Sequence, residues 1–95
     1  MQKACAGASH SRDPIVAEYL NTLGVLYCAK RDLRQGRRLL EHSSEMRSFI
    51  FPCESHPSRI QSMRCEAMLL ISEDSMWKGI SKLRKALSLA RERDL

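Results

Sequence analysis

The chain has 95 residues, which is room for one small domain or for part of a larger one. Hydrophobic residues make up 43% and aromatic residues 5%, with only four glycines and three prolines, so the composition favours helices around an aliphatic core. The net charge of +5 comes from basic residues interspersed with acids, which disfavours a nucleic-acid patch, and no stretch approaches the ~18 apolar residues of a membrane span.

Residues 1–12 are small and polar, and they are expected to be a tail or the remnant of a preceding helix. A first helix is predicted from Pro14 to about Lys30, with Asp13 as its N-cap and proline in its first turn. Four apolar residues recur within it at helical spacing and are predicted to face the core: Val16, Leu20, Leu23 and Tyr27.

A turn at residues 30–33 is predicted to lead into a second helix, capped by Asp32 and stopped by Phe51-Pro52. A third helix is predicted from about Pro57 to Ser72. After a turn at residues 74–75, a fourth helix is predicted to begin at Met76.

The third and fourth helices repeat the first and second at an offset of 43 residues. Identical residues mark the offset: Pro14 and Pro57, Leu26 and Leu69, Gly36 and Gly79, Leu40 and Leu83. A helix–turn–helix unit that recurs at a fixed period predicts an all-α fold of two antiparallel repeats, residues 13–55 and 56–95, stacked as a short α-solenoid.

The segments LNTLGVLY and LRQGRRLL resemble the tetratricopeptide (TPR) repeat. The matching positions of the first copy are Leu20, Leu23, Gly24, Tyr27, Gly36 and Leu40, and those of the second are Met63, Glu66, Ala67, Leu70, Gly79 and Leu83. The usual TPR period is about 34 residues, so the longer period resembles the version found in kinesin light chains and nephrocystin-like proteins. Arg31 stands where that pattern has a turn glycine.

The resemblance implies a protein-binding module or scaffold that holds a peptide or helix in the concave groove of the solenoid. The groove residues that it implies are Glu18, Asn21, Val25, Cys28, Gln61, Arg64, Met68 and Ser72. An amide such as that of Asn21 can bond a peptide backbone as donor and acceptor. Arg64 could bind a carboxylate by a bidentate contact. Both residues could equally be solvated side chains.

Two alternatives stay open beside this one. A basic helical domain could bind nucleic acid through Lys78, Lys82 and Lys85, which share a helix face, together with Arg91 and Arg93. The chain could also be a structural cap of a larger repeat protein. Because about three repeats usually make a stable solenoid, the chain is expected to be the end of a longer array or to self-associate through its open end.

The sequence offers no support for catalysis, a metal or a cofactor. Cys53 and His56 lie three residues apart, but no second pair supplies the remaining ligands of a zinc site. Cys28 and Cys65 fall on helical stripes and are expected to be small core residues. With no secretory leader expected and no disulfide-scaffold spacing among its cysteines, the protein is predicted to be cytoplasmic.

Overall fold

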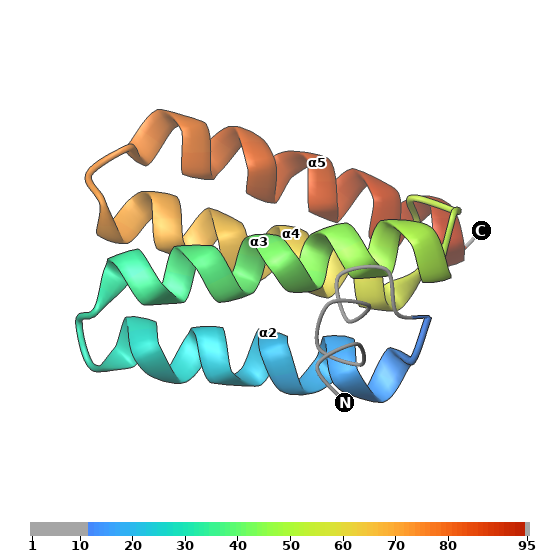
Figure 1. Ribbon diagram of the computed structural model, residues 1–95. Coiled ribbons are helices and arrows are strands. Elements are labelled where there is room, and N and C mark those ends of the chain that lie inside the picture. The colour runs from blue at the N-terminus through green and yellow to red at the C-terminus, as the bar shows by residue number, and fades with distance from the viewer. Residues whose placement is uncertain (1–11, 95) are drawn as a thin grey trace, which may run out of the picture.

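A computed structural model describes residues 12–94, and within this range all regular structure is helical (Figure 1). Its helices are α2 (Pro14–Ala29), α3 (Leu33–Ile50), α4 (Pro57–Ser72) and α5 (Met76–Asp94). Helix α2 pairs with α3 and α4 with α5 as antiparallel hairpins, and α3 packs on α4 to join them. The predicted all-α fold of two stacked helix–turn–helix units is therefore confirmed. None of the described helices has the length and hydrophobicity needed to cross a bilayer.

The helix boundaries follow the capping signals of the sequence. Asp13 and His56 each accept a hydrogen bond from the backbone N–H two residues on, at 2.9 and 3.1 Å. Each is followed by a proline, which fits the first turn because its missing N–H would be unpaired there. The His56 ring also stacks on Phe51, with centroids 3.8 Å apart, which fixes the linker between the hairpins.

The turns inside the two hairpins share one backbone geometry. Arg31 and Asp74, 43 residues apart, both adopt a left-handed conformation with φ of 70° and 64°. Equivalent hydrogen bonds close the turns, from Asp32 N–H to the Tyr27 carbonyl at 2.9 Å and from Ser75 N–H to the Leu70 carbonyl at 2.8 Å. These are Schellman motifs, in which glycine usually holds the left-handed position.

Small residues let the helices of each hairpin cross closely. A Cβ on Gly79 would lie 2.9 Å from the Ala67 carbonyl oxygen and 2.6 Å from Ile71 Cγ1. A Cβ on Gly36 would lie 3.1 Å from the carbonyl oxygen of Gly24, which is the repeat counterpart of Ala67. Neither position can take a side chain unless the two helices move apart. The 43-residue period therefore holds in the packing as well as in the sequence.

This close crossing overturns the predicted core face of α2. The residues of α2 that face α3 are small or polar: Ala17, Asn21 and Gly24 are buried, whereas Leu23 is exposed. The prediction was wrong for Leu23, and Val16, Leu20 and Tyr27 are only half-buried, because helices that approach through glycine leave no room for large side chains between them. Those side chains lie at the edges of the contact or in solvent.

The two hairpins are joined by a buried arginine. Arg47 on α3 is 3% exposed, and its Nη1 donates hydrogen bonds of 3.0 Å to the Ser58 carbonyl and to Ser62 Oγ on α4. Burial lowers the pKa of its guanidinium, which stays charged at any physiological pH. Arg37 forms a second link, an ion pair with Glu73 at the end of α4.

Replacing Arg31 with glycine should raise the free energy of unfolding by about 1 kcal/mol, because glycine adopts φ of 70° without a steric penalty. The matched control is Lys30→Gly. Lys30 has a φ of −83°, so it has no left-handed steric penalty for glycine to remove, and Lys30→Gly should leave stability unchanged or lower it. Urea denaturation followed by circular dichroism measures both. Equal effects of the two variants would contradict the assignment of strain to Arg31.

Truncating Arg47 to alanine should lower the free energy of unfolding by about 2–4 kcal/mol, since it removes two charge-assisted hydrogen bonds and leaves a cavity between α3 and α4. The control is Arg38→Ala on the same helix. Arg38 is exposed, and among the described residues its side chain bonds only Gln35, so this change should alter stability by less than about 0.5 kcal/mol. The same denaturation experiment applies, and similar losses in the two variants would contradict a junction role for Arg47.

Candidate functional site

The predicted groove residues lie along α2 and α4, and six of the eight are accessible or exposed. We define the α2–α4 surface by these six: Glu18, Val25, Gln61, Arg64, Met68 and Ser72. The contact between Asn21 Nδ2 and Cys65 Sγ, at 3.6 Å, marks where the two helices approach each other. The six residues flank this contact at helical spacings, so they share one side of the hairpin stack.

Two apolar side chains stand out on the α2–α4 surface. Val25 on α2 and Met68 on α4 are 42% and 55% exposed, and they occupy the same position in the two repeats. Polar side chains flank both residues. Glu18 precedes Val25 along α2, and Gln61 and Arg64 precede Met68 along α4. An apolar centre with a polar rim is the general pattern of protein-binding surfaces.

The other two predicted residues do not lie on the open surface. Asn21 is only 4% exposed, and its Oδ1 is buried with no hydrogen-bond donor reaching it among the described residues. Its position between α2, α3 and α4 corrects the expectation that its amide faces a ligand. The cause is the rotation of α2, which turns the face with Gly24 and Asn21 toward its neighbours.

Cys28 is half-buried at the same inward face of α2, where it adjoins Gly36 of α3. Burial raises the pKa of its thiol, and electrostatic interactions with Cys65 and Glu73 raise it further. The thiol is therefore protonated at neutral pH. This state suits packing and does not suit nucleophilic chemistry, which needs the thiolate.

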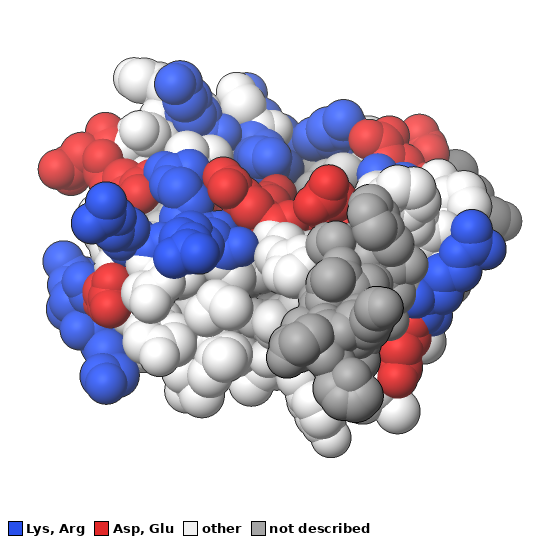
Figure 2. Space-filling view, viewed as in Figure 1, with Lys and Arg blue, Asp and Glu red and all other residues white. Residues whose placement is uncertain are grey.

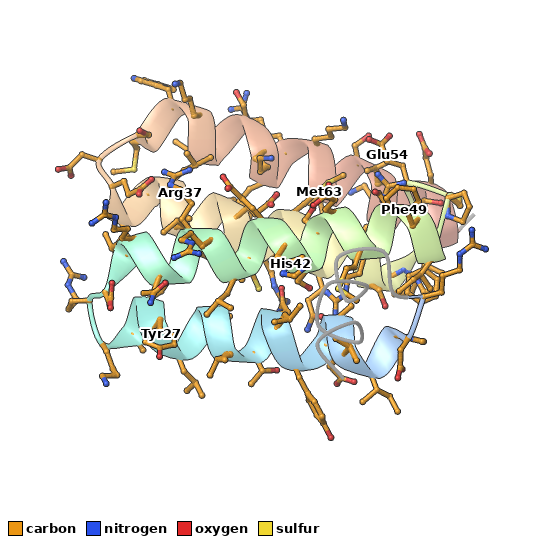
Figure 3. All side chains as sticks on the ribbon, viewed as in Figure 1. Tyr27, Arg37, His42, Phe49, Glu54 and Met63 are labelled. Carbon is orange, nitrogen blue, oxygen red and sulfur yellow. The ribbon has the colours of Figure 1, made fainter. Side chains whose placement is uncertain are left out.

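A second concave feature lies between α4 and α5 and was not predicted from the sequence. It is a groove of about 440 Å³ lined by Met63, Leu70, Lys78, Ser81, Lys82 and Lys85. Met63 is labelled in Figure 3, between the two helices. The shared face of the three lysines was visible in the sequence, but the apolar floor under them needed the packing of α4 on α5.

Two of these lysines are paired within the chain. Lys82 lies 3.4 Å from Glu66, and Lys85 lies 3.0 Å from Glu54 in the linker. Lys78 has no ion pair among the described residues. Figure 2 shows blue and red atoms side by side over the upper half of the molecule, where α3 and α5 face the viewer, whereas the lower edge along α2 is mostly white. The basic residues therefore do not form a continuous field on this face.

Scans of protein-family models, of curated proteins and of solved structures found nothing that matches this chain. The TPR resemblance therefore rests on the residues of the chain itself.

The Glu54–Lys85 pair yields a titration test. The hydrogen bond and charge of Lys85 lower the pKa of Glu54, so Lys85→Gln should raise this pKa toward its ordinary value. Because the folded-state pKa is the lower one, any stability from the pair is present above the unfolded pKa and is lost as the pH falls through the folded pKa. Carboxyl ¹³C shifts of Glu54 against pH measure the change. Lys78→Gln is the control and should leave the titration of Glu54 unaltered, and an unchanged pKa in Lys85→Gln would contradict the pairing.

Proposed function

We propose that the protein is a protein-binding module that holds a peptide or a helix on the α2–α4 surface. The observation that carries the proposal is the exposed pair Val25 and Met68, which stand at equivalent positions of two stacked repeats. Apolar side chains this exposed gain free energy when a ligand covers them. Their regular spacing suits a ligand that is itself extended or helical.

The polar rim supplies direction and specificity. Arg64 is exposed beside Met68 and can bind a carboxylate through two parallel hydrogen bonds. Glu18 on α2 offers the opposite charge across the surface. A ligand with an apolar centre and an acidic group near α4 fits this arrangement best. The opposite charges of Arg64 and Glu18 then set the orientation of the ligand.

The resemblance to TPR proteins supports binding without catalysis. We place the protein in the cytoplasm, where thiols stay reduced. Cys28 and Cys65, on α2 and α4, are free thiols, which agrees with a reducing compartment.

The α4–α5 groove supports a second candidate, the capture of an acidic segment. Lysine stems can cover an apolar ligand while their ammonium groups meet its carboxylates. A nucleic acid is a weaker candidate for this groove, because the ion pairs of Lys82 and Lys85 would have to break and tyrosine or tryptophan side chains do not line it.

The test is selection of peptides from a random displayed library on the immobilised protein, followed by affinity measurement of the selected peptides. We expect the double variant Val25→Glu/Met68→Glu to weaken binding at least about tenfold, which corresponds to ~1.4 kcal/mol. Trp77→Glu is the matched control, since Trp77 is 80% exposed on α5 and lies outside both surfaces. It should leave the affinity unchanged.

Amide chemical-shift mapping of a selected peptide separates the outcomes. Shifts that cluster on α2 and α4 around Val25 and Met68 support the proposal. Shifts confined to the lysines of the α4–α5 groove would contradict it in favour of the second candidate. If no peptide is enriched above a blank surface, a purely structural capping role is favoured instead.

A further inference from the structure

The outer edge of α2 carries an apolar stripe that its own hairpin leaves exposed. Ile15, Tyr19 and Leu26 follow one another at helical spacing and are 55%, 69% and 55% exposed. Figure 2 shows this edge as a mostly uncharged region along the bottom of the view. Three large apolar side chains in one row are more than the scattered exposed residues of an ordinary surface.

The second repeat shows what covers this stripe when a neighbour is present. The counterparts of Ile15, Tyr19 and Leu26 on α4 are Ser58, Ser62 and Leu69. Ser62 and Leu69 are only 3% and 4% exposed, and α3 of the preceding hairpin packs over this side of α4 and bonds both serines through Arg47. The stripe on α2 is therefore the face on which the last helix of a preceding hairpin would pack.

The opposite end of the stack carries a matching stripe on α5. Its members recur at helical spacing: Met76, Ile80, Leu87 and Ala90. Met76 and Leu87 are about half exposed, at 51% and 52%. The corresponding residues of α3 are Leu33, Arg37, Ser44 and Arg47, and of these Arg37 and Arg47 bond α4 or its C-cap. Where the internal junction has two arginines and a serine, the open end has aliphatic side chains.

The open faces of α2 and α5 are both less polar than the α3–α4 junction at the equivalent positions. Inside the chain, Arg47 meets Ser62, whereas at the ends the same positions hold Ala90 and Tyr19. The internal junction is held by hydrogen bonds and an ion pair, and the two open faces are apolar at the equivalent positions. Each open face therefore matches the other better than it would match either face of the internal junction.

We propose that the protein assembles head to tail, with α5 of one copy packed on α2 of a second copy in the register that α3 and α4 use within the chain. The contact is heterologous, so it leaves one α2 face and one α5 face free at the ends of each assembly. A hollow of about 300 Å³ beside Leu87, lined by Arg84, Ser88, Arg91 and Glu92, lies one turn from Ala90. In the proposed contact Tyr19 of the second copy lies in this hollow, where the guanidinium of Arg84 or Arg91 can stack on its ring.

Sedimentation equilibrium and light scattering on the full chain test the assembly. From about 1 µM to about 1 mM, the average mass should rise steadily with concentration and pass beyond that of a dimer. Leu26→Glu on the α2 face and Leu87→Glu on the α5 face should each give a monomer throughout this range. In a solution of either variant alone, every contact would contain a mutated face.

A mixture of the two variants distinguishes a head-to-tail contact from a symmetric one. The intact α5 face of Leu26→Glu fits the intact α2 face of Leu87→Glu, so an equimolar mixture should form a 1:1 dimer and stop there. If α2 instead paired with α2, Leu87→Glu would dimerise by itself, and that result would overturn the proposal.

Trp77→Glu and Met68→Glu are the controls, because both replace exposed apolar residues outside the two stripes. Both should assemble as the unchanged chain does, and circular dichroism verifies that every variant is folded. A chain that stays monomeric at all concentrations would overturn the proposal and would leave the α2 stripe to residues 1–11 or to a different protein.

Discussion

One buried guanidinium holds the two halves of this molecule together. Arg47 reaches from α3 to both a backbone carbonyl and a hydroxyl of α4. These hydrogen bonds are directional, so they set the rotation and the register of the second hairpin against the first. Aliphatic side chains alone would allow several near-equivalent packings. The α2–α4 surface spans both hairpins, so its shape depends on this junction.

Within each hairpin the distance between the two helices is set by a glycine, which has no side chain. Gly36 and Gly79 bring the second helix of each pair against the backbone of the first. Close approach gains contact between main chains and forces large side chains away from the contact. The apolar stripe at the edge of α2 and the exposed pair Val25 and Met68 both result from that displacement. The surfaces proposed to bind a ligand or a second copy thus follow from the way the hairpins close.

The helices were predictable because capping residues and prolines close to each end determine where a helix begins and ends. Asp13, Asp32 and the prolines act within a few residues, and the boundaries agree with the structure to within one residue. The orientation of α2 was not predictable, because this helix is apolar nearly all round, so its periodicity points to no single face. Asn21 was misplaced for the same reason. The α4–α5 groove was also missed, since it combines Met63 and Leu70 with lysines of another helix.

Two copies with so few identical residues nevertheless share caps, turns and close contacts position by position. The left-handed turn is held at one place by an arginine and at the other by an aspartate. What repeats is a set of main-chain hydrogen bonds, and such bonds place little demand on the side chains attached to them. The two units could therefore diverge freely in their surfaces while the scaffold stayed the same. The backbone atoms of a residue can thus preserve the turn while its side chain changes the surface.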